Sequence, residues 1–164
     1  MQLIHQSISG DSIVTKDEAL TNRQLLGMLV YGEARGASSI FKFNVAVTVM
    51  ARWYRVLWHP EKYEYYGQSI REIITKKYQY SCFLESDPNF IKIQDPFSYD
   101  SRKIVDSCFL LAKDVHDVFS FGKPNSEILR TMPTHYETMN KNPEWAKKLT
   151  YLYKIDNGEF YRED

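Results

Sequence analysis

The 164-residue sequence predicts an α+β fold that is mostly helical and ends in a small β-hairpin. Three long stretches repeat apolar residues at three- and four-residue spacings, as a helix with one buried face requires. Near the end, TYLYKIDNGEFYR alternates on both sides of Asn157-Gly158, a strong hairpin signal. Residues 1–20 are polar and weakly patterned, so we expect a loosely ordered arm followed by one domain over residues 21–164.

The first helix is expected to begin at Thr21 or Asn22, because either side chain can cap the first free backbone N–H groups. A run of apolar residues follows, LLGMLV, at helical spacing. The helix should end between Gly32 and Gly36, since glycine favours the position just past a helix end.

A second helix is expected over residues 43–57, where valines and a tryptophan recur at helical spacing, and Pro60 closes it. A short helix is expected over residues 69–77. There Ser69 and Glu72 have the spacing of a capping box, in which the two residues satisfy each other's backbone N–H groups.

Residues 78–100 read as irregular, and residues 101–119 as the third long helix. The string FGKPNS is expected to form a turn, and MPTHYET an extended segment or loop. Asn142, Pro143 and Glu144 have the preferred order of a helix start: a cap, a proline at the first position and an acid in the first turn.

The charge balance argues against a polyanionic partner. Lysine plus arginine and aspartate plus glutamate both number 21, so the chain lacks the basic excess of nucleic-acid-binding proteins. No uninterrupted apolar stretch approaches the ~20 residues of a membrane span. Cys82 and Cys108 have neither metal-site spacing nor a disulfide framework, so we expect buried thiols and no metal or cofactor.

Glu33 is the one acid on the apolar face of the first helix. It continues the stripe of Leu26, Leu29 and Val30, so its carboxyl group should face the core or a cleft bordering it. Burial and the position at a helix C-terminus both favour the protonated form, which a general acid needs. Alternatively, Glu33 lies at a frayed helix end and pairs with Arg35 or a more distant arginine.

Several short strings keep the order and spacing of one enzyme family. LGMLVYGEARG resembles the opening motif of the SleB/CwlJ-type cell-wall hydrolases, the spore-cortex-lytic enzyme family, in which the glutamate of YGEARG is catalytic. FNVAVTVMARWYRV is similar to the next helix of that family, and YQYSCF to its QFS segment. MPTHYET, NPEWAKKL and FYR resemble its closing elements in the same order, so the resemblance covers residues 25–162.

Four positions depart from the family pattern. Ala37 stands where a second acid usually follows GEARG, and Ala51 lies near a usual asparagine. Glu137 follows THY in place of a histidine, and Gly158 or Glu159 replaces a histidine near the end. These differences leave the proposed acid intact, alter the inherited substrate contacts and indicate a diverged branch, with a phage-encoded protein as one hypothesis.

The resemblance implies a lysozyme/lytic-transglycosylase-like catalytic domain that acts on peptidoglycan glycan strands, at the β-1,4 bond between N-acetylmuramic acid and N-acetylglucosamine. Two-carboxylate glycosidases need a second acid at a defined separation. Asp87, Asp95, Asp100 and Asp106 read as turn or solvated helix residues. We therefore expect a lytic transglycosylase, in which Glu33 alone is acid and then base and the product carries a 1,6-anhydromuramic end.

Six further residues are candidates for substrate binding: Tyr136, His135, Thr134, Gln79, Ser81 and Tyr31. His135 and Tyr136 are expected to line the cleft and bond an acetamido group or the reacting oxygen, and Gln79 and Ser81 to contact sugar hydroxyls. Structural roles are the alternatives: a satisfied histidine, a loop-shaping threonine, loop-stabilising polar residues and a core tyrosine.

Three rival functions stay open at this point. Within the same class, a muramidase would use water in place of the muramic acid C6 hydroxyl. An inactive relative would keep the cleft as a glycan-binding module. A structural or assembly protein would carry GEARG by coincidence.

The first residues, MQLIHQSISGDS, lack the basic leader and apolar core of a secretory signal. An enzyme made in the cytoplasm would therefore reach the cell wall by another route. Release during phage lysis and transport in a virion are two such routes.

Overall fold

A computed structural model describes residues 20–77, 79–122, 124–138 and 143–164. These residues are mostly helical and carry one three-stranded antiparallel sheet, which confirms the predicted α+β class. The arm expected at residues 1–20 lies outside them, except for the buried Leu20. The elements are α1 Asn22–Ala34, α2 Ser39–Trp58, α3 Pro60–Tyr63, η2 Glu64–Tyr66, α4 Ile70–Thr75, η3 Ser81–Phe83, α5 Phe90–Gln94, η4 Pro96–Ser98, α6 Arg102–Gly122, α7 Ser126–Thr131, β1 His135–Glu137, η5 Ala146–Lys148, β2 Thr150–Ile155 and β3 Gly158–Arg162.

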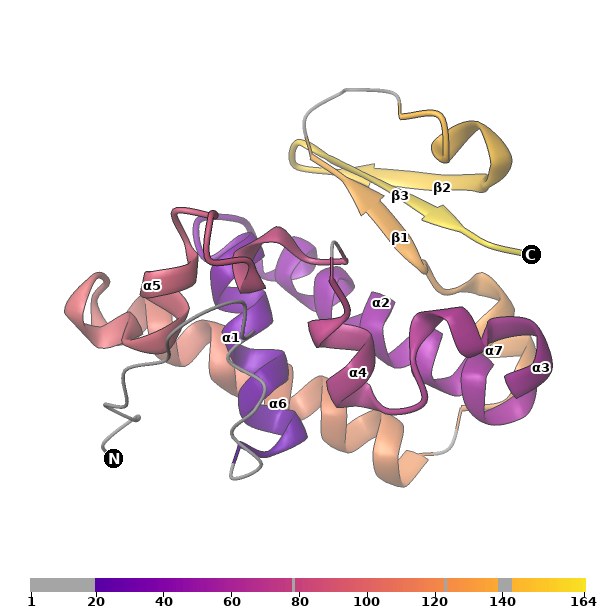
Figure 1. The fold of residues 1–164 in the computed structure, drawn as a ribbon, viewed down its shortest axis with the longest axis horizontal. Helices are drawn as coiled ribbons and strands as arrows, with labels where there is room; N and C mark the ends of the chain where they lie inside the picture. Colours follow the sequence, from indigo (N-terminus) through magenta and orange to yellow (C-terminus); the bar gives the residue numbers. More distant parts are fainter. Residues whose placement is uncertain (1–19, 78, 123, 139–142) are drawn as a thin grey trace.

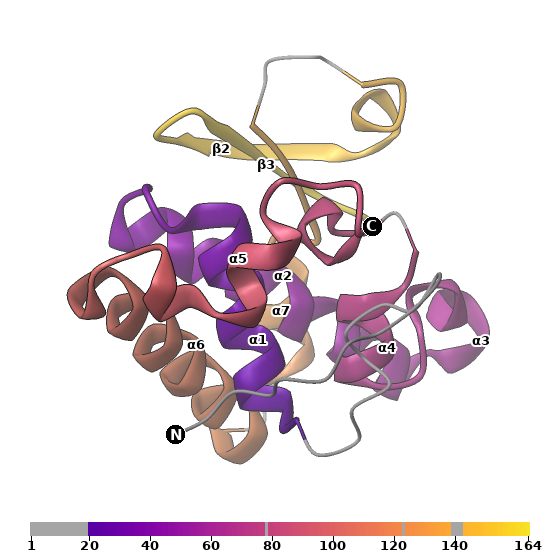
Figure 2. The ribbon, with the colours of Figure 1, turned by 60° about the vertical axis from the view of Figure 1, so that its left-hand side comes forward.

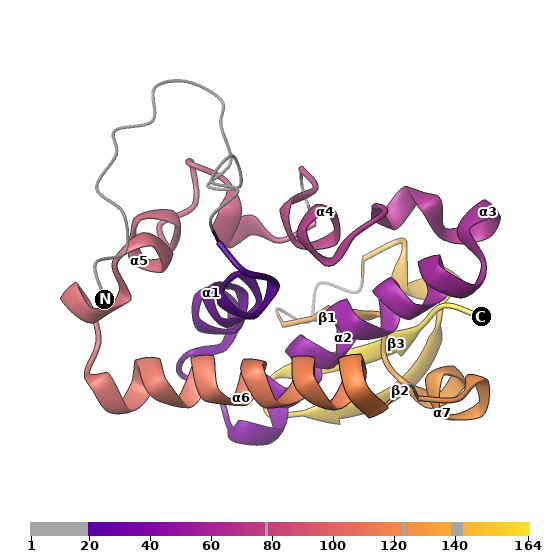
Figure 3. The same ribbon diagram turned by 90° about the horizontal axis from the view of Figure 1, so that it is seen from below.

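Helix α1 is the centre of the helical part and contacts α2, α4, α5 and α6 (Figure 3). Leu25, Leu26 and Leu29 are fully buried, as is most of the helix. At Gly27 an added Cβ atom would lie 2.5 Å from the ring of Phe109 on α6. The missing side chain therefore allows the close packing of these two helices.

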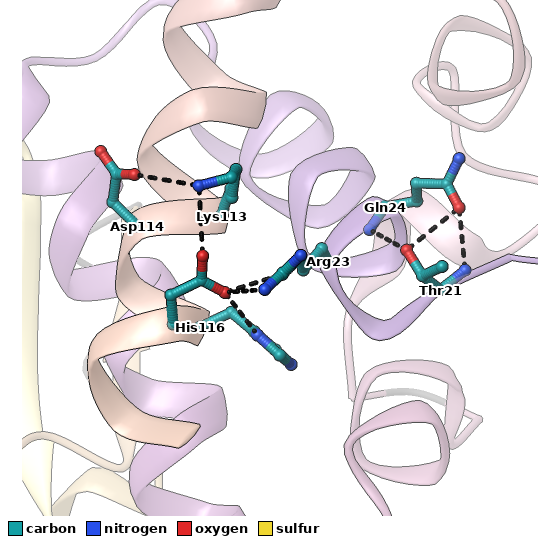
Figure 4. Close-up of polar contacts among 7 residues, drawn as sticks. Thr21, Arg23, Gln24, Lys113, Asp114 and His116 are labelled. Carbon is teal, nitrogen blue, oxygen red and sulfur yellow. Dashed lines mark hydrogen bonds and ion pairs between the residues drawn. The ribbon is translucent and has the colours of Figure 1, made fainter. Parts of the chain in front are cut away.

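The N-terminus of α1 has the capping box that its sequence allows. Thr21 Oγ1 accepts the Gln24 N–H, and the Gln24 side chain accepts the Thr21 N–H (Figure 4). Between these two residues, Arg23 forms an ion pair of 2.6 Å with Asp117 of α6, which also binds Lys113. These pairs are partly exposed, so they orient the helices more than they stabilise them.

Helix α2 begins four residues earlier than predicted, because Ser38 caps it by accepting the N–H of Phe41. It ends at Trp58, directly before His59 and Pro60. The predicted cap of the short helix is confirmed, since Ser69 accepts an N–H from the first turn of α4.

Three short α-helices, α3, α5 and α7, were not expected from the sequence. Residues 78–100, predicted as irregular, contain η3, α5 and η4, and α7 follows the FGKPNS turn. Asn125 caps α7 by accepting the N–H of Ile128. Segments of five or six residues contain too few turns for a helical period to show in sequence.

The helix start expected at residues 142–144 is not present as such. Asn142 lies outside the described residues, and the chain forms a turn at Glu144 before the single 3-10 turn at Ala146–Lys148. The predicted hairpin is confirmed, with its turn shifted by one residue. Ile155 pairs with Gly158, so Asp156 and Asn157 form the turn, and Asp156 adopts a φ of 51°.

The sheet has the strand order β1-β3-β2, and β1 comes from the MPTHYET string. It lies on one side of the helical part, close to α2 (Figures 1 and 2). Phe160 of β3 is fully buried and packs edge-on against Phe41 of α2, with ring centroids 5.4 Å apart. At Gly158 any side chain would collide with the Phe41 ring, so glycine is required at the end of the hairpin turn.

Within the described ranges, no helix combines the length and the apolar character that crossing a membrane requires. Cys82 and Cys108 are both free and buried, as predicted. Burial raises the pKa of each thiol, so both are protonated at neutral pH.

Candidate active site

A cavity of about 390 Å³ lies where the helical part meets the hairpin. Its walls come from the end of α1, the start of α2 and the β2–β3 turn. Among its lining residues are Glu33, Gly36, Ser38, Phe41, Asp156 and Gly158. The cavity therefore exists only where segments from both ends of the sequence come together.

Glu33 stands in the last turn of α1, half-buried at this cavity. Its Oε2 accepts a hydrogen bond of 3.0 Å from the hydroxyl of Tyr136 on β1. Its Oε1 accepts a longer one, 3.4 Å, from the backbone N–H of Cys82 in η3. The expectation that this carboxyl group faces a cleft bordering the core agrees with its position.

Gly32 allows the Cys82 contact. A Cβ atom at Gly32 would lie 2.7 Å from Cys82 Cβ and 2.8 Å from Ile93 Cγ2. The segment that approaches this glycine thus belongs to the chain itself. Gly36 differs, because an added Cβ there would meet no described atom within 4 Å, and this glycine lines the cavity.

The proposed pairing of Glu33 with Arg35 is wrong, because Arg35 binds two other residues. Its Nε lies 3.3 Å from Asp100 Oδ2, and its Nη1 donates to Asn89 Oδ1 at 2.8 Å. Tyr31 also binds Asp100, with its hydroxyl 2.6 Å from Oδ2, and it is fully buried. Burial and the hydrogen bond to Asp100 raise the pKa of Tyr31. The assignment of Tyr31 to the substrate is corrected, since this residue belongs to the core.

Thr134 is also fully buried, and every polar contact described for it is within the protein. Its Oγ1 accepts the N–H of Glu163 at 2.9 Å, and its carbonyl accepts Arg52 Nε at 2.6 Å. Thr134 therefore shapes the loop, and the expectation that it binds substrate is wrong because the residue is fully buried.

His135 lies on the far side of β1 from Tyr136, because successive strand residues point to opposite faces. Its ring is half-buried between those of Tyr66 and Trp145, with centroids 6.0 and 5.5 Å away. Burial, and then the charges of two arginines, lower the pKa of His135 to about 3. A neutral, packed imidazole on that face has a structural role, which corrects the expectation that it lines the cleft beside Glu33.

Gln79 and Ser81 are not among the residues that line the cavity. Gln79 is half-buried, and its Oε1 accepts a hydrogen bond of 2.8 Å from Arg52 Nη1. Ser81 is exposed at the start of η3, one residue before Cys82.

Arg52 is a residue whose importance the sequence analysis missed. It is 5% exposed, and besides Thr134 and Gln79 it contacts the hydroxyl of Tyr80 at 3.3 Å. Its guanidinium also lies 5.0 Å from the centre of the Tyr66 ring. The signal was present, since Arg52 falls on the apolar face of α2 just as Glu33 falls on that of α1. The Arg52 side chain thus connects the THY segment, through Thr134, to the YQYSCF segment, through Gln79 and Tyr80.

Asp156 is a second carboxylate at the cavity, in contrast to the sequence-based expectation of one acid alone. Its Oδ2 accepts the backbone N–H of Ser38 at 2.9 Å, which connects the hairpin turn to the start of α2. Hydrogen bonds from Ser38 lower the pKa of Asp156, so it is ionised at neutral pH. Sequence reasoning missed it because an aspartate in a hairpin turn needs no further explanation.

Comparison of the chain with protein-family models, curated proteins and solved structures found no match. Among the described residues, no group of three or more histidine, cysteine, aspartate or glutamate side chains is placed to hold a metal ion.

Proposed function

We propose that this chain cleaves the β-1,4 bond between N-acetylmuramic acid and N-acetylglucosamine in peptidoglycan, as a lytic transglycosylase with a lysozyme-like architecture. One observation carries the proposal: Glu33 accepts hydrogen bonds from Tyr136 and from the backbone of Cys82. These three residues come from the three strings YGEARG, THY and YQYSCF, which resemble one cell-wall hydrolase family. Strings that are far apart in the chain meet at one carboxyl group beside a cavity.

In the proposed reaction, protonated Glu33 gives its proton to the glycosidic oxygen while the bond to the muramic acid C1 breaks. N-acetylglucosamine leaves with a free C4 hydroxyl group. The muramic acid C6 hydroxyl then bonds to C1, and its proton returns to Glu33. No water is consumed, and the carboxyl group is restored. The contacts of Tyr136 and Cys82 hold the carboxyl group in one orientation between turnovers.

The test is to incubate the protein with purified sacculi and to measure the masses of the soluble products. The proposal expects 1,6-anhydromuropeptides from the wild type and at least a 10³-fold slower release from Glu33→Gln, which keeps the shape but cannot carry the proton. Glu85→Gln, which changes an exposed acid away from the cavity, should keep full activity. Binding to sacculi without release would make the chain a glycan-binding module. If the protein neither binds sacculi nor releases soluble products, the result would favour a structural or assembly protein.

Asp156 supports a second candidate, hydrolysis by water. An ionised carboxylate at the same cavity as Glu33 could activate water or attack the sugar, as in two-carboxylate glycosidases. Hydrolysis yields products one water heavier than the anhydro route. Asp156→Asn separates the routes, because asparagine tolerates the positive φ of this position and still accepts the Ser38 N–H. Transglycosylation should survive this substitution, and hydrolysis should be lost.

A further inference from the structure

A second, larger cavity of about 500 Å³ lies at the other end of α2. Its lining includes Arg55, Trp58, His59, Lys62, Arg130 and Arg162. Phe41, beside the first cavity, and Trp58 are 17 residues apart in one helix, so the two cavities are about 25 Å apart. A ligand in the second cavity would therefore not touch Glu33.

The second cavity is positively charged. Four permanent cations line it, Arg55, Lys62, Arg130 and Arg162, against the two carboxylates of Glu163 and Asp164. Both carboxylates already have partners. That of Glu163 accepts the hydroxyl groups of Tyr65 and Tyr66, and that of Asp164 accepts Thr150 and Arg162. Lys62 donates to the Asp164 carbonyl oxygen and Arg162 pairs with the Asp164 carboxylate, so Arg55 and Arg130 are the cations left to face a space large enough for a small ligand.

Arg55 is a buried cation with only part of its hydrogen-bonding capacity satisfied. Its side chain is only 8% exposed, and its Nη2 donates to the carbonyl of Glu163 at 3.1 Å. Its Nη1 is buried and has no hydrogen-bond partner among the described residues. A charged donor without a partner is costly in a protein interior. Arg55 lines the cavity, so an acceptor that reached its guanidinium group from there would relieve that penalty.

The neighbouring groups favour an oxyanion. A guanidinium presents paired N–H groups that match the two oxygens of a carboxylate or phosphate. Arg130 extends from α7 on the exposed side, and Lys62 comes from α3, so the charges surround the space from different elements. Trp58 is 40% exposed at the same cavity and offers a flat apolar face beside the charges.

We infer that this cavity is a binding site for a carboxylate or phosphate group carried by a small ligand, with Arg55 and Arg130 as its main contacts. The inference is independent of the proposed peptidoglycan activity, because it uses none of the residues around Glu33. Carboxylate and phosphate share the chemistry that the site recognises, and the experiment distinguishes them.

The experiment is a nuclear magnetic resonance titration of the full chain with inorganic phosphate and, separately, with succinate, at ionic strength matched by sodium chloride. Saturable shifts are expected for the backbone amides of Trp58 and His59 and for the Trp58 indole, with the Glu33 amide unchanged. Saturation by phosphate alone, by succinate alone or by both supports the site and identifies the preferred oxyanion. Shifts no larger than those with chloride would overturn it.

Arg130→Gln should weaken binding about tenfold, since it removes one charge-assisted contact from an exposed position without disturbing the core. Arg102→Gln is the matched control, because Arg102 is an exposed arginine of α6 that does not line the cavity. It should leave the affinity unchanged. Equal affinities for the two variants, or shifts centred on other residues, would refute the assignment. Arg130 keeps the test decisive even if substitutions of the buried Arg55 fail to fold.

Discussion

The hydroxyl of Tyr136 donates a hydrogen bond of 3.0 Å to Oε2 of Glu33, although the two residues are 103 positions apart. This contact brings the end of the first helix and the first strand of the sheet to the same carboxyl group. Tyr136→Phe and Gly32→Ala change the surroundings of Glu33 directly, whereas substitutions of His135 and Arg52 test the packing around β1.

Tyr136→Phe removes the hydroxyl and keeps the ring that packs 5.9 Å from Phe160. If Glu33 is the acid/base, the loss of one positioned donor should slow product release by about 10–100-fold, with a loss of roughly 1 kcal/mol in unfolding free energy. The measurements are initial release rates from sacculi and urea denaturation. Tyr153→Phe is the control, because its hydroxyl binds Asn44 and not Glu33. Equal rates for the two variants would argue against a role for the Tyr136 hydroxyl.

Gly32→Ala should destabilise the protein by about 1–3 kcal/mol, because the new Cβ atom would press on Cys82 and Ile93 in a packed interior. Relief of that overlap moves η3 and its N–H away from Glu33. Gly36→Ala has open space around it and a negative φ, so its stability should change by less than ~0.5 kcal/mol. Urea denaturation of both variants gives the comparison, and similar values would show that α1 does not need glycine at position 32.

His135 should make folding pH-dependent. The folded pKa of His135 is about 3, below the usual 6.5, so between these values only the unfolded chain takes up the proton. Neutral His135 therefore makes its full contribution to the free energy of unfolding above pH 6.5. This contribution falls as the pH drops toward 3, by up to ~1.4 kcal/mol per pH unit. His135→Phe keeps the ring contacts and removes the titration. The wild type should therefore lose more stability than His135→Phe between pH 7 and pH 5, measured by urea denaturation. Parallel losses would contradict a neutral, buried His135.

Arg52→Lys should cost about 3 kcal/mol in unfolding free energy. Lysine keeps the charge but cannot reach the carbonyl of Thr134 and the side chain of Gln79 with the same planar geometry. Chemical denaturation would measure the change. Arg102→Lys, on the exposed surface of α6, should shift the midpoint hardly at all. If Arg52→Lys left the free energy of unfolding unchanged, a positive charge at position 52 would be enough for stability without the planar hydrogen bonds.

The parts of the fold that could be predicted from the sequence are those with a long repeat. Helices α1, α2 and α6 span 13, 20 and 21 residues, which is enough for a 3.6-residue period to show. The hairpin was also predictable, since Asn157-Gly158 and the alternating flanks are local signals. Helices α5 and α7 have only five and six residues, and packing determines them more than local pattern does.

The site was predictable only in part, for a related reason. Glu33 stood out because an acid on an apolar helix face contradicts a local rule. Asp156 and Arg52 acquire their roles from the approach of a remote segment, the start of α2 for one and the loop at Thr134 for the other. The sequence identifies such residues only after the tertiary arrangement is known. Of the residues that the string resemblance suggested, Tyr136 contacts Glu33, whereas Thr134 faces the interior and His135 the other side of the sheet.

The contact between Glu33 and Tyr136 can form only late in the synthesis of the chain. During translation the first helix is complete long before residue 136 emerges from the ribosome, so the carboxyl group waits for its hydroxyl partner until most of the polypeptide has been made. A nascent or prematurely terminated chain therefore carries the glutamate without its assembled surroundings.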